Sequence, residues 1–439
     1  MAAVARRVFP LLSLAMAAAL AWPSPTAGFS GFGPLSADAT YGSQMRFTLQ
    51  LPGGPPDKLE LLLRFAGSDS TFVAPVTPGP RSAEYIWDVA TRPITPNTAI
   101  AYRWRVTNGG VVTLSPEQNL LYGDNRPGLN WRTARIGAAT VHWYGSAESQ
   151  ARHFGDISAS AAAAAETLLG HNLVGPIDIF VYVSQADFFG ALGPGAREWT
   201  GAATFPQLRT IFMWLGGGSP SYLDTTITHE VTHVVFQDAT ANPFHQPAKW
   251  FNEGLAAWSE QQSAVDQAAA VRSAAAGGAL LALDGISESF PIGDQAARLS
   301  YAEGATMVQM IIDRYGRTSI AAIAAAWRDG AGDGAALGAG TGVNVDQLYR
   351  DYFASFGVQA PTAVQPAPLL LSNVGKPPQP NASGVAQPAS PAPSAQPGAQ
   401  TGGTASDLVW IAAIAATGLA LGVVVALIAR RRRRPAGPA

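Results

Sequence analysis

The chain has 439 residues, enough for two domains and additional segments that are not globular. Its formal net charge is −2 and only 13% of its residues are charged, so no basic surplus indicates a nucleic-acid partner. Cysteine is absent, which excludes disulfides, cysteine nucleophiles and thiolate metal sites. Any metal ion would therefore have to be held by histidine and carboxylate side chains.

The N-terminus has the pattern of a secretory signal peptide at residues 1–28. Arg6 and Arg7 precede an apolar stretch, and the small residues Thr26 and Gly28 provide a cleavage site. The alternative is an N-terminal membrane anchor that is not cleaved. Both interpretations predict that the bulk of the chain is exported.

The C-terminal part predicts a membrane anchor. Residues 359–406 are rich in Pro, Ala and Ser and predict an extended stalk. Residues 408–429 carry no charge and are long enough to cross a bilayer, so we expect a single transmembrane helix at 407–429. The arginines at 430–434 then begin a cytoplasmic basic tail, 430–439, rather than a nucleic-acid patch, because they adjoin the apolar stretch. These features predict a single-pass protein of the cell membrane whose folded part is extracellular.

Residues 29–135 show the period-two alternation of β-strands. Met45, Phe47 and Leu49 alternate with polar residues, and Asn108-Gly109 provides a tight turn. The pattern predicts an all-β sandwich of the immunoglobulin or fibronectin type III kind. It contains no group of residues typical of catalysis, so we interpret it as a spacer or as a module with a surface ligand of its own.

Residues 136–358 predict an α+β domain, because strands come first and helices follow. The expected strands are 140–143, 177–183 and 210–215, and the expected helices are 159–169, 225–237, 250–262, 264–282, 300–315, 320–327 and 345–356. The strand at 210–215 is either a sheet edge on which a peptide substrate pairs or an ordinary half-buried strand.

The sequence His229-Glu230-Val231-Thr232-His233 lies in the helix expected at 225–237. A spacing of four places both imidazoles on one helix face, where they can bind one ion. Glu230 projects about 100° away from His229 around the helix, next to the metal, where a carboxylate can take a proton from water. The alternative is a helix with two surface or capping histidines.

A catalytic zinc site needs a third protein ligand. The extended motif HExxHxxGxxH is excluded, because its glycine and last histidine positions hold Phe236 and Ala239. Glu253 follows on the helix expected at 250–262, at the distance that an HExxH site with a glutamate ligand requires.

The two segments HEVTH and WFNEGLAAW, at 229–233 and 250–258, resemble the gluzincin metallopeptidases. Within these they are similar to the peptidase MA-like domains of bacterial surface proteins, over roughly residues 137–357. The resemblance implies a zincin-like catalytic domain in which Zn²⁺ is bound by His229, His233 and Glu253. It also implies that Tyr301 stabilises the oxyanion, whereas the alternative for Tyr301 is a tyrosine packed in the core.

The chain departs from these relatives in two ways. Thermolysin-like members carry an aspartate that orients a ligand histidine four residues after the glutamate ligand, but this chain has Ala257 there. Glu260 and Asp224 are the candidate replacements, unless they are surface charges. The GxMEN motif with which aminopeptidases bind a free amino terminus is also missing, which favours an endopeptidase.

We therefore expect a membrane-anchored extracellular zinc metallopeptidase, a hydrolase of peptide or protein substrates in which Glu230 is the base. The alternative is an adhesion or sensor protein with a peptidase fold and no turnover.

Overall fold

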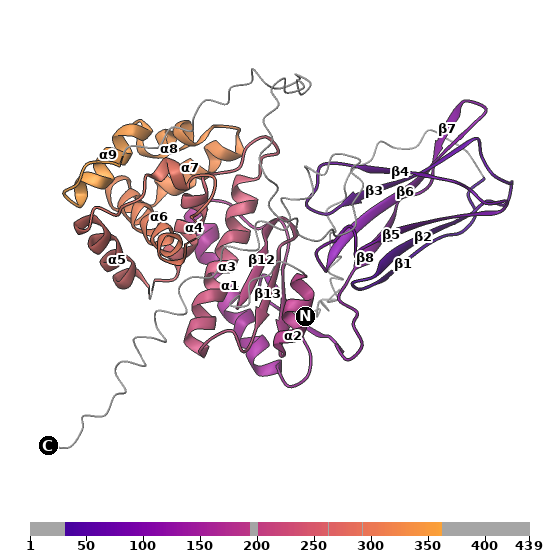
Figure 1. Ribbon diagram of the computed structural model, residues 1–439, viewed down its shortest axis with the longest axis horizontal. Helices are drawn as coiled ribbons and strands as arrows, with labels where there is room; N and C mark the ends of the chain where they lie inside the picture. The colour runs from indigo at the N-terminus through magenta and orange to yellow at the C-terminus, as the bar shows by residue number, and fades with distance from the viewer. Residues whose placement is uncertain (1–30, 194–200, 262, 292, 362–439) are drawn as a thin grey trace, which may run out of the picture.

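The computed structural model describes residues 31–193, 201–261, 263–291 and 293–361 (Figure 1). The predicted signal peptide, transmembrane helix and basic tail lie outside the described residues, as does the predicted stalk beyond residue 361. Within the ranges given above, no helix combines the length and the apolar character needed to cross a bilayer.

The N-terminal part consists of two antiparallel sheets that enclose one core (Figure 1). The first has the order β1-β2-β5, with β1 Leu35–Thr40, β2 Gln44–Gln50 and β5 Ser82–Asp88. The second has the order β4-β3-β6-β7 with β8 also on β6; its strands are β3 Lys58–Phe65, β4 Phe72–Val76, β6 Thr98–Asn108, β7 Val111–Leu114 and β8 Gln118–Tyr122.

The alternation of apolar and polar residues along the strands produces this core, as the sequence predicts. Met45, Phe47 and Leu49 on β2 are fully buried, and so is Trp104 on β6. The rings of Phe47 and Tyr102 meet edge to face across the two sheets, with centroids 5.1 Å apart. The N-terminal part therefore has a hydrophobic core of its own.

The second part contains a mixed sheet with the order β12-β13-β11-β10-β9. Its strands are β9 Arg132–Ile136, β10 Ala139–Trp143, β11 Ile177–Tyr182, β12 Ala202–Phe205 and β13 Thr210–Trp214. β10, β11 and β13 are parallel, while the outer strands β9 and β12 are antiparallel to their neighbours. β9 lies before the boundary expected at residue 136, yet it pairs with β10.

Helices cover this sheet and continue as a separate helical layer (Figure 1). They are α1 Glu148–Leu169, α2 Gln185–Leu192, α3 Pro220–Thr240, α4 Lys249–Ser259, α5 Ala264–Ala276, α6 Asp294–Tyr315, α7 Thr318–Arg328, α8 Asp333–Thr341 and α9 Val345–Ser355; η1 Pro206–Leu208 and η2 Leu283–Ile286 are short 3₁₀ turns. The predicted helix 264–282 ends early at Ala276, because Gly277 and Gly278 follow and Gly278 has a φ of +64°. The predicted helix 300–315 instead begins earlier, at Asp294.

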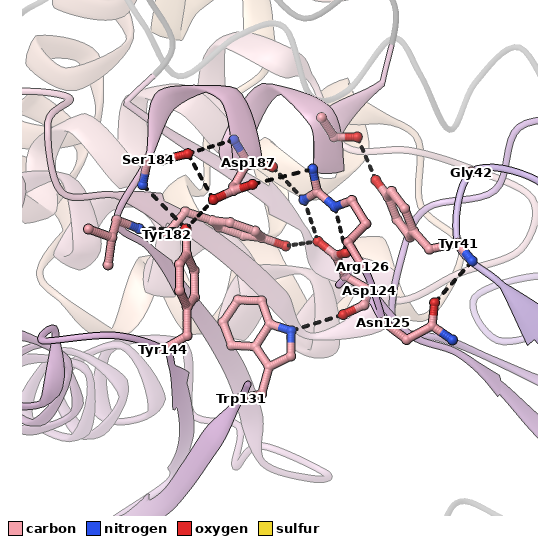
Figure 2. Close-up of polar contacts among 12 residues, drawn as sticks. Tyr41, Gly42, Asp124, Asn125, Arg126, Trp131, Tyr144, Tyr182, Ser184 and Asp187 are labelled. Carbon is pink, nitrogen blue, oxygen red and sulfur yellow. Dashed lines mark hydrogen bonds and ion pairs between the residues drawn. The ribbon is translucent and has the colours of Figure 1, made fainter. Parts of the chain in front are cut away.

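A partly buried polar junction joins the two parts (Figure 2). Arg126 donates two hydrogen bonds to the carboxylate of Asp124, at 2.8 and 2.6 Å, and a third to the backbone oxygen of Asp187 on α2. Its guanidinium lies 4.9 Å from the ring centroid of Tyr41, which follows β1. The Tyr41 hydroxyl donates to the backbone oxygen of Gly190, also on α2. The N-terminal part is therefore held directly against the second part.

Candidate metal centre

Helices α3 and α4 bring the three predicted ligands together. α3 begins with Ser219 capping its N-terminus and Pro220 in its first turn, and it continues through the motif. The side chains of His229, His233 and Glu253 are all buried, and their ligand atoms lie within 4.8 Å of one another. Among the described residues, this is the group of His, Asp and Glu side chains that could hold a metal ion.

The distances between these ligand atoms suit a tetrahedral ion. The two Nε2 atoms of His229 and His233 are 3.1 Å apart, and Oε2 of Glu253 lies 3.7 and 3.3 Å from them. Ligands bound at 2.0–2.1 Å in tetrahedral geometry lie about 3.3 Å from one another. Oε2 of Glu253 is buried without a hydrogen-bond donor in the described part of the chain. The donor set therefore fits zinc.

Hydrogen bonds on the outer side of each imidazole fix its orientation. Nδ1 of His229 lies 2.8 Å from Oε1 of Glu260, and Nδ1 of His233 lies 2.9 Å from Oδ1 of Asn252. Both partners are acceptor oxygens, so each Nδ1 carries the hydrogen and, in a neutral imidazole, each Nε2 presents its lone pair to the centre. Metal binding requires this tautomer.

Glu260 thus orients the ligand His229, which Ala257 cannot do because its side chain has no hydrogen-bonding group. It is buried directly after the last residue of α4, two helical turns beyond Glu253, and it also accepts a hydrogen bond from Ser263. The other candidate, Asp224, does not contact a predicted ligand, because its carboxylate pairs with Nε2 of His153 at 2.9 Å. The idea that both carboxylates are surface charges is wrong for Glu260.

The electrostatics of the cluster favour positive charge at its centre. Burial alone would lower the pKa of His229, but the neighbouring carboxylates of Glu253 and Glu260 outweigh burial and raise this pKa to about 10. Burial likewise would raise the pKa of Glu253, and the neighbouring His233 and His229 instead hold it well below its usual range. A proton and a metal ion compete for such a site.

Two glycines allow α6 to pack closely against α4, the helix that carries Glu253. A β-carbon at Gly254 would lie 2.6 Å from the backbone oxygen of Gly304, and a β-carbon at Gly304 would lie 3.0 Å from Cα of Gly254. Only residues without side chains permit this approach. It follows that Glu253 and Tyr301, each within a turn of one of these glycines, belong to two helices in backbone contact.

The structure places Tyr301 beside the predicted ligands. It is buried on α6, and its ring centroid lies 6.3 Å from that of His229. Phe290 packs edge to face on its other side, at 5.0 Å. Glu230 is buried next to His229 on α3.

The strand expected at 210–215 is present as β13, but the alternative that it forms a sheet edge is wrong. β13 lies between β11 and β12, so it is an interior strand, and it is buried along most of its length. The edge of the sheet on this side is β12. Sequence patterns alone did not distinguish the two strands, because both are short and apolar.

Sequence reasoning also missed Asn252, Gly304 and Lys249 as residues near the site. Asn252 directly precedes a ligand, and Lys249 lies one helical turn before the same ligand; this spacing was the available signal. Gly304 had no such signal, because its importance arises from contact with a helix distant in sequence.

The fold and the arrangement of the site together identify the class of metal centre. An HExxH helix, a glutamate ligand on the next helix and a mixed sheet in front of them form a gluzincin-type metal centre. Residues 158–357 match the family model described as Peptidase MA superfamily. This part of the chain is therefore a peptidase MA-like domain.

Several solved structures resemble the chain at low identity. One is an alanine mutant of a two-domain M1 zinc metallopeptidase bound to L-tryptophan, with 13% identity, a TM-score of 0.33, and coverage of 74% of this chain and 92% of that chain. An M1 zinc metallopeptidase mutant from Deinococcus radiodurans bound to a Tyr-Ser-Ala substrate has 14% identity, a TM-score of 0.28 and the same coverage. An aminopeptidase N family protein from Idiomarina loihiensis has 9% identity, a TM-score of 0.31, and coverage of 73% and 70%. No curated protein matches the sequence.

Proposed function

We propose that the protein is a zinc-dependent metallopeptidase that hydrolyses peptide bonds. The observation that carries this proposal is the convergence of His229, His233 and Glu253 within 4.8 Å, with Glu230 buried on the same helix as the two histidines. Two neutral imidazoles and one carboxylate are a ligand set that suits zinc. The match of residues 158–357 to the Peptidase MA superfamily supports the same reaction.

The residues of the chain have distinct tasks in this reaction. Zinc, when bound, would polarise the substrate carbonyl and lower the pKa of water to roughly 7. Glu230 takes the proton of the attacking water and transfers it to the leaving amine. The Tyr301 hydroxyl donates a hydrogen bond to the carbonyl oxygen as negative charge develops on it. Glu260 and Asn252 keep the two imidazoles in the orientation that binding requires.

We further propose that the enzyme acts outside the cell and is attached to the membrane. The support comes from the sequence: a signal peptide at 1–28, a stalk at 359–406 and an apolar stretch at 407–429 followed by arginines. Expression of the full chain and of a chain ending at residue 406 tests this. The full chain should sediment with membranes with its catalytic domain accessible to external protease, and the shortened chain should be released to the medium. Recovery of the full chain in the soluble fraction would contradict the proposal.

The hydrolytic function is tested with a broad peptide library and the zinc-loaded chain, with and without a chelator. Cleavage should occur only without chelator. Glu230→Gln should abolish hydrolysis while zinc remains bound, because Glu230 is not a ligand. Undiminished cleavage by this variant would refute the mechanism, and a library left intact by the wild type would favour the adhesion or sensor alternative.

A further inference from the structure

Lys249 is a cation on the helix that carries Glu253, and within the described residues it forms no ion pair with a carboxylate. It is the first residue of α4, one helical turn before Glu253, and it is partly buried. Its Nζ lies 5.3 Å from the ring centroid of Phe290. Throughout the described residues, no carboxylate oxygen lies within 4.0 Å of this ammonium. The reactions proposed above do not use it.

A continuous set of contacts connects Lys249 to the residues of the site. Phe290 contacts both the ammonium and the ring of Tyr301, whose centroid is 5.0 Å from that of Phe290. Tyr301 in turn contacts the ring of His229. Two aromatic rings, Phe290 and Tyr301, therefore connect the ammonium to the metal-binding imidazole.

The surroundings of Lys249 favour the binding of an anion. Burial lowers the pKa of its amine, and the charge of Glu253 opposes this effect. A cation that is partly removed from water loses hydration, and a carboxylate that hydrogen-bonds to it restores the lost interaction.

The spacing between Lys249 and the ligand Glu253 along α4 limits how far a substrate carboxylate bound by Lys249 lies from the scissile bond. Four residues of helix rise about 6 Å along the axis, and one extended residue of a peptide spans about 3.5 Å. We therefore expect a substrate carboxylate that binds Lys249 to lie within about two residues of a scissile carbonyl at the metal.

On the basis of the proposed peptidase function, we propose that Lys249 is a specificity residue that binds a substrate carboxylate within two residues of the scissile bond. The carboxylate is either the free C-terminus of the peptide or an acidic side chain. Both have the same chemistry, and matched substrates distinguish them. The enzyme then prefers peptides that carry negative charge next to the cleaved bond.

The test compares three peptides that share one cleavage site. The first ends one residue after the scissile bond with a free carboxylate, the second has a C-terminal amide there, and the third is amidated and has aspartate instead of asparagine at that residue. Wild type should cleave one or both carboxylate-bearing peptides with a kcat/KM about 10- to 100-fold higher than the neutral peptide, as expected for a charge-assisted hydrogen bond. Lys249→Met should remove this preference, and Lys249→Arg should restore part of it.

Two further measurements separate specificity from a structural role. Lys249 could serve only as a counter-charge for Glu253, in which case Lys249→Met would lower zinc content and reduce hydrolysis of all three peptides equally. Lys58→Met is the matched control, because Lys58 is exposed on β3 in the N-terminal part and should change neither preference nor zinc content. A uniform loss, or a wild type with equal kcat/KM for all three peptides, would overturn the proposal.

Binding provides a readout that does not require turnover. In the zinc-loaded Glu230→Gln protein, calorimetry should show tighter binding of the carboxylate peptides than of the neutral one, and Lys249→Met in that background should abolish the difference. Charge-dependent binding by a wild type that does not hydrolyse would leave the inference standing and remove the peptidase function. Hydrolysis without any preference for charge would support the peptidase function and refute the role proposed for Lys249.

Discussion

Replacement of Glu260 tests whether a carboxylate outside the three ligands sets the metal affinity. Its Oε1 lies 2.8 Å from Nδ1 of His229, in a buried position. Loss of such an outer partner typically lowers metal affinity 10- to 100-fold, which corresponds to about 1.4 to 2.8 kcal/mol. We expect Glu260→Ala to weaken zinc binding by about 100-fold, because it removes the acceptor, and Glu260→Gln by about tenfold, because an amide oxygen can still accept. Competition with a chromophoric chelator at neutral pH measures both values.

Two further variants make the measurement decisive. Asn252→Ala removes a neutral acceptor from His233 and should cost about tenfold, because neutral hydrogen bonds are roughly half as strong as charged ones. Glu288→Gln changes an exposed carboxylate and should leave zinc affinity unchanged. If Glu260→Ala bound zinc as tightly as Glu288→Gln, the assignment of Glu260 as the orienting residue would be wrong.

Three other predictions concern stability. Gly254→Ala should destabilise the second part by several kcal/mol and lower hydrolysis, because its β-carbon meets the backbone of Gly304; a Tm equal to that of wild type would contradict the close crossing. Burial raises the pKa of Glu303 from 4.5 to about 7, with a smaller opposing effect from its hydrogen bond with a backbone N–H. The native state therefore holds the extra proton, and stability is full below pH 4.5 and falls by about 3 kcal/mol as pH rises through 7. Urea unfolding of wild type and Glu303→Gln should show this loss only in wild type, and an equal loss in both would exclude Glu303 as its source. Arg126→Met leaves the buried Asp124 carboxylate without its cation and should cost about 3 to 5 kcal/mol; calorimetry should then show the N-terminal part melting separately, whereas an unchanged single transition would contradict the junction.

The sequence predicts the main elements because their patterns are local. Alternation on β2 and β6 identifies strands that bury one face, and the motif helix α3 has a capped start and a long apolar face. The short helices α2 and α8 were not predicted, because each has few apolar positions from which to measure a period. The boundary expected at residue 136 divides a tight hairpin, because β9 pairs with β10 through the two-residue turn at Gly137 and Ala138.

The site was predictable to the extent that spacing along a helix determines it. His229 and His233 share a face whatever surrounds them, and the position of Glu253 on the next helix was expected from the resemblance. What the sequence did not determine is burial. Glu260 and Asp224 are both carboxylates near ligands in sequence, and only the crossing of α4 over α3 buries one against His229 and leaves the other to His153.

The contact between Gly254 and Gly304 has a consequence for protein engineering. Where two helices meet through bare backbone, any added side chain forces one helix to shift, so this contact restricts the geometry of the metal ligands. Lys249 and Phe290 lie at the start of α4 and in the loop before α6, away from that contact. If Lys249 binds substrate as proposed, a library of variants restricted to these two positions is where peptide preference can be changed without altering the contact between Gly254 and Gly304.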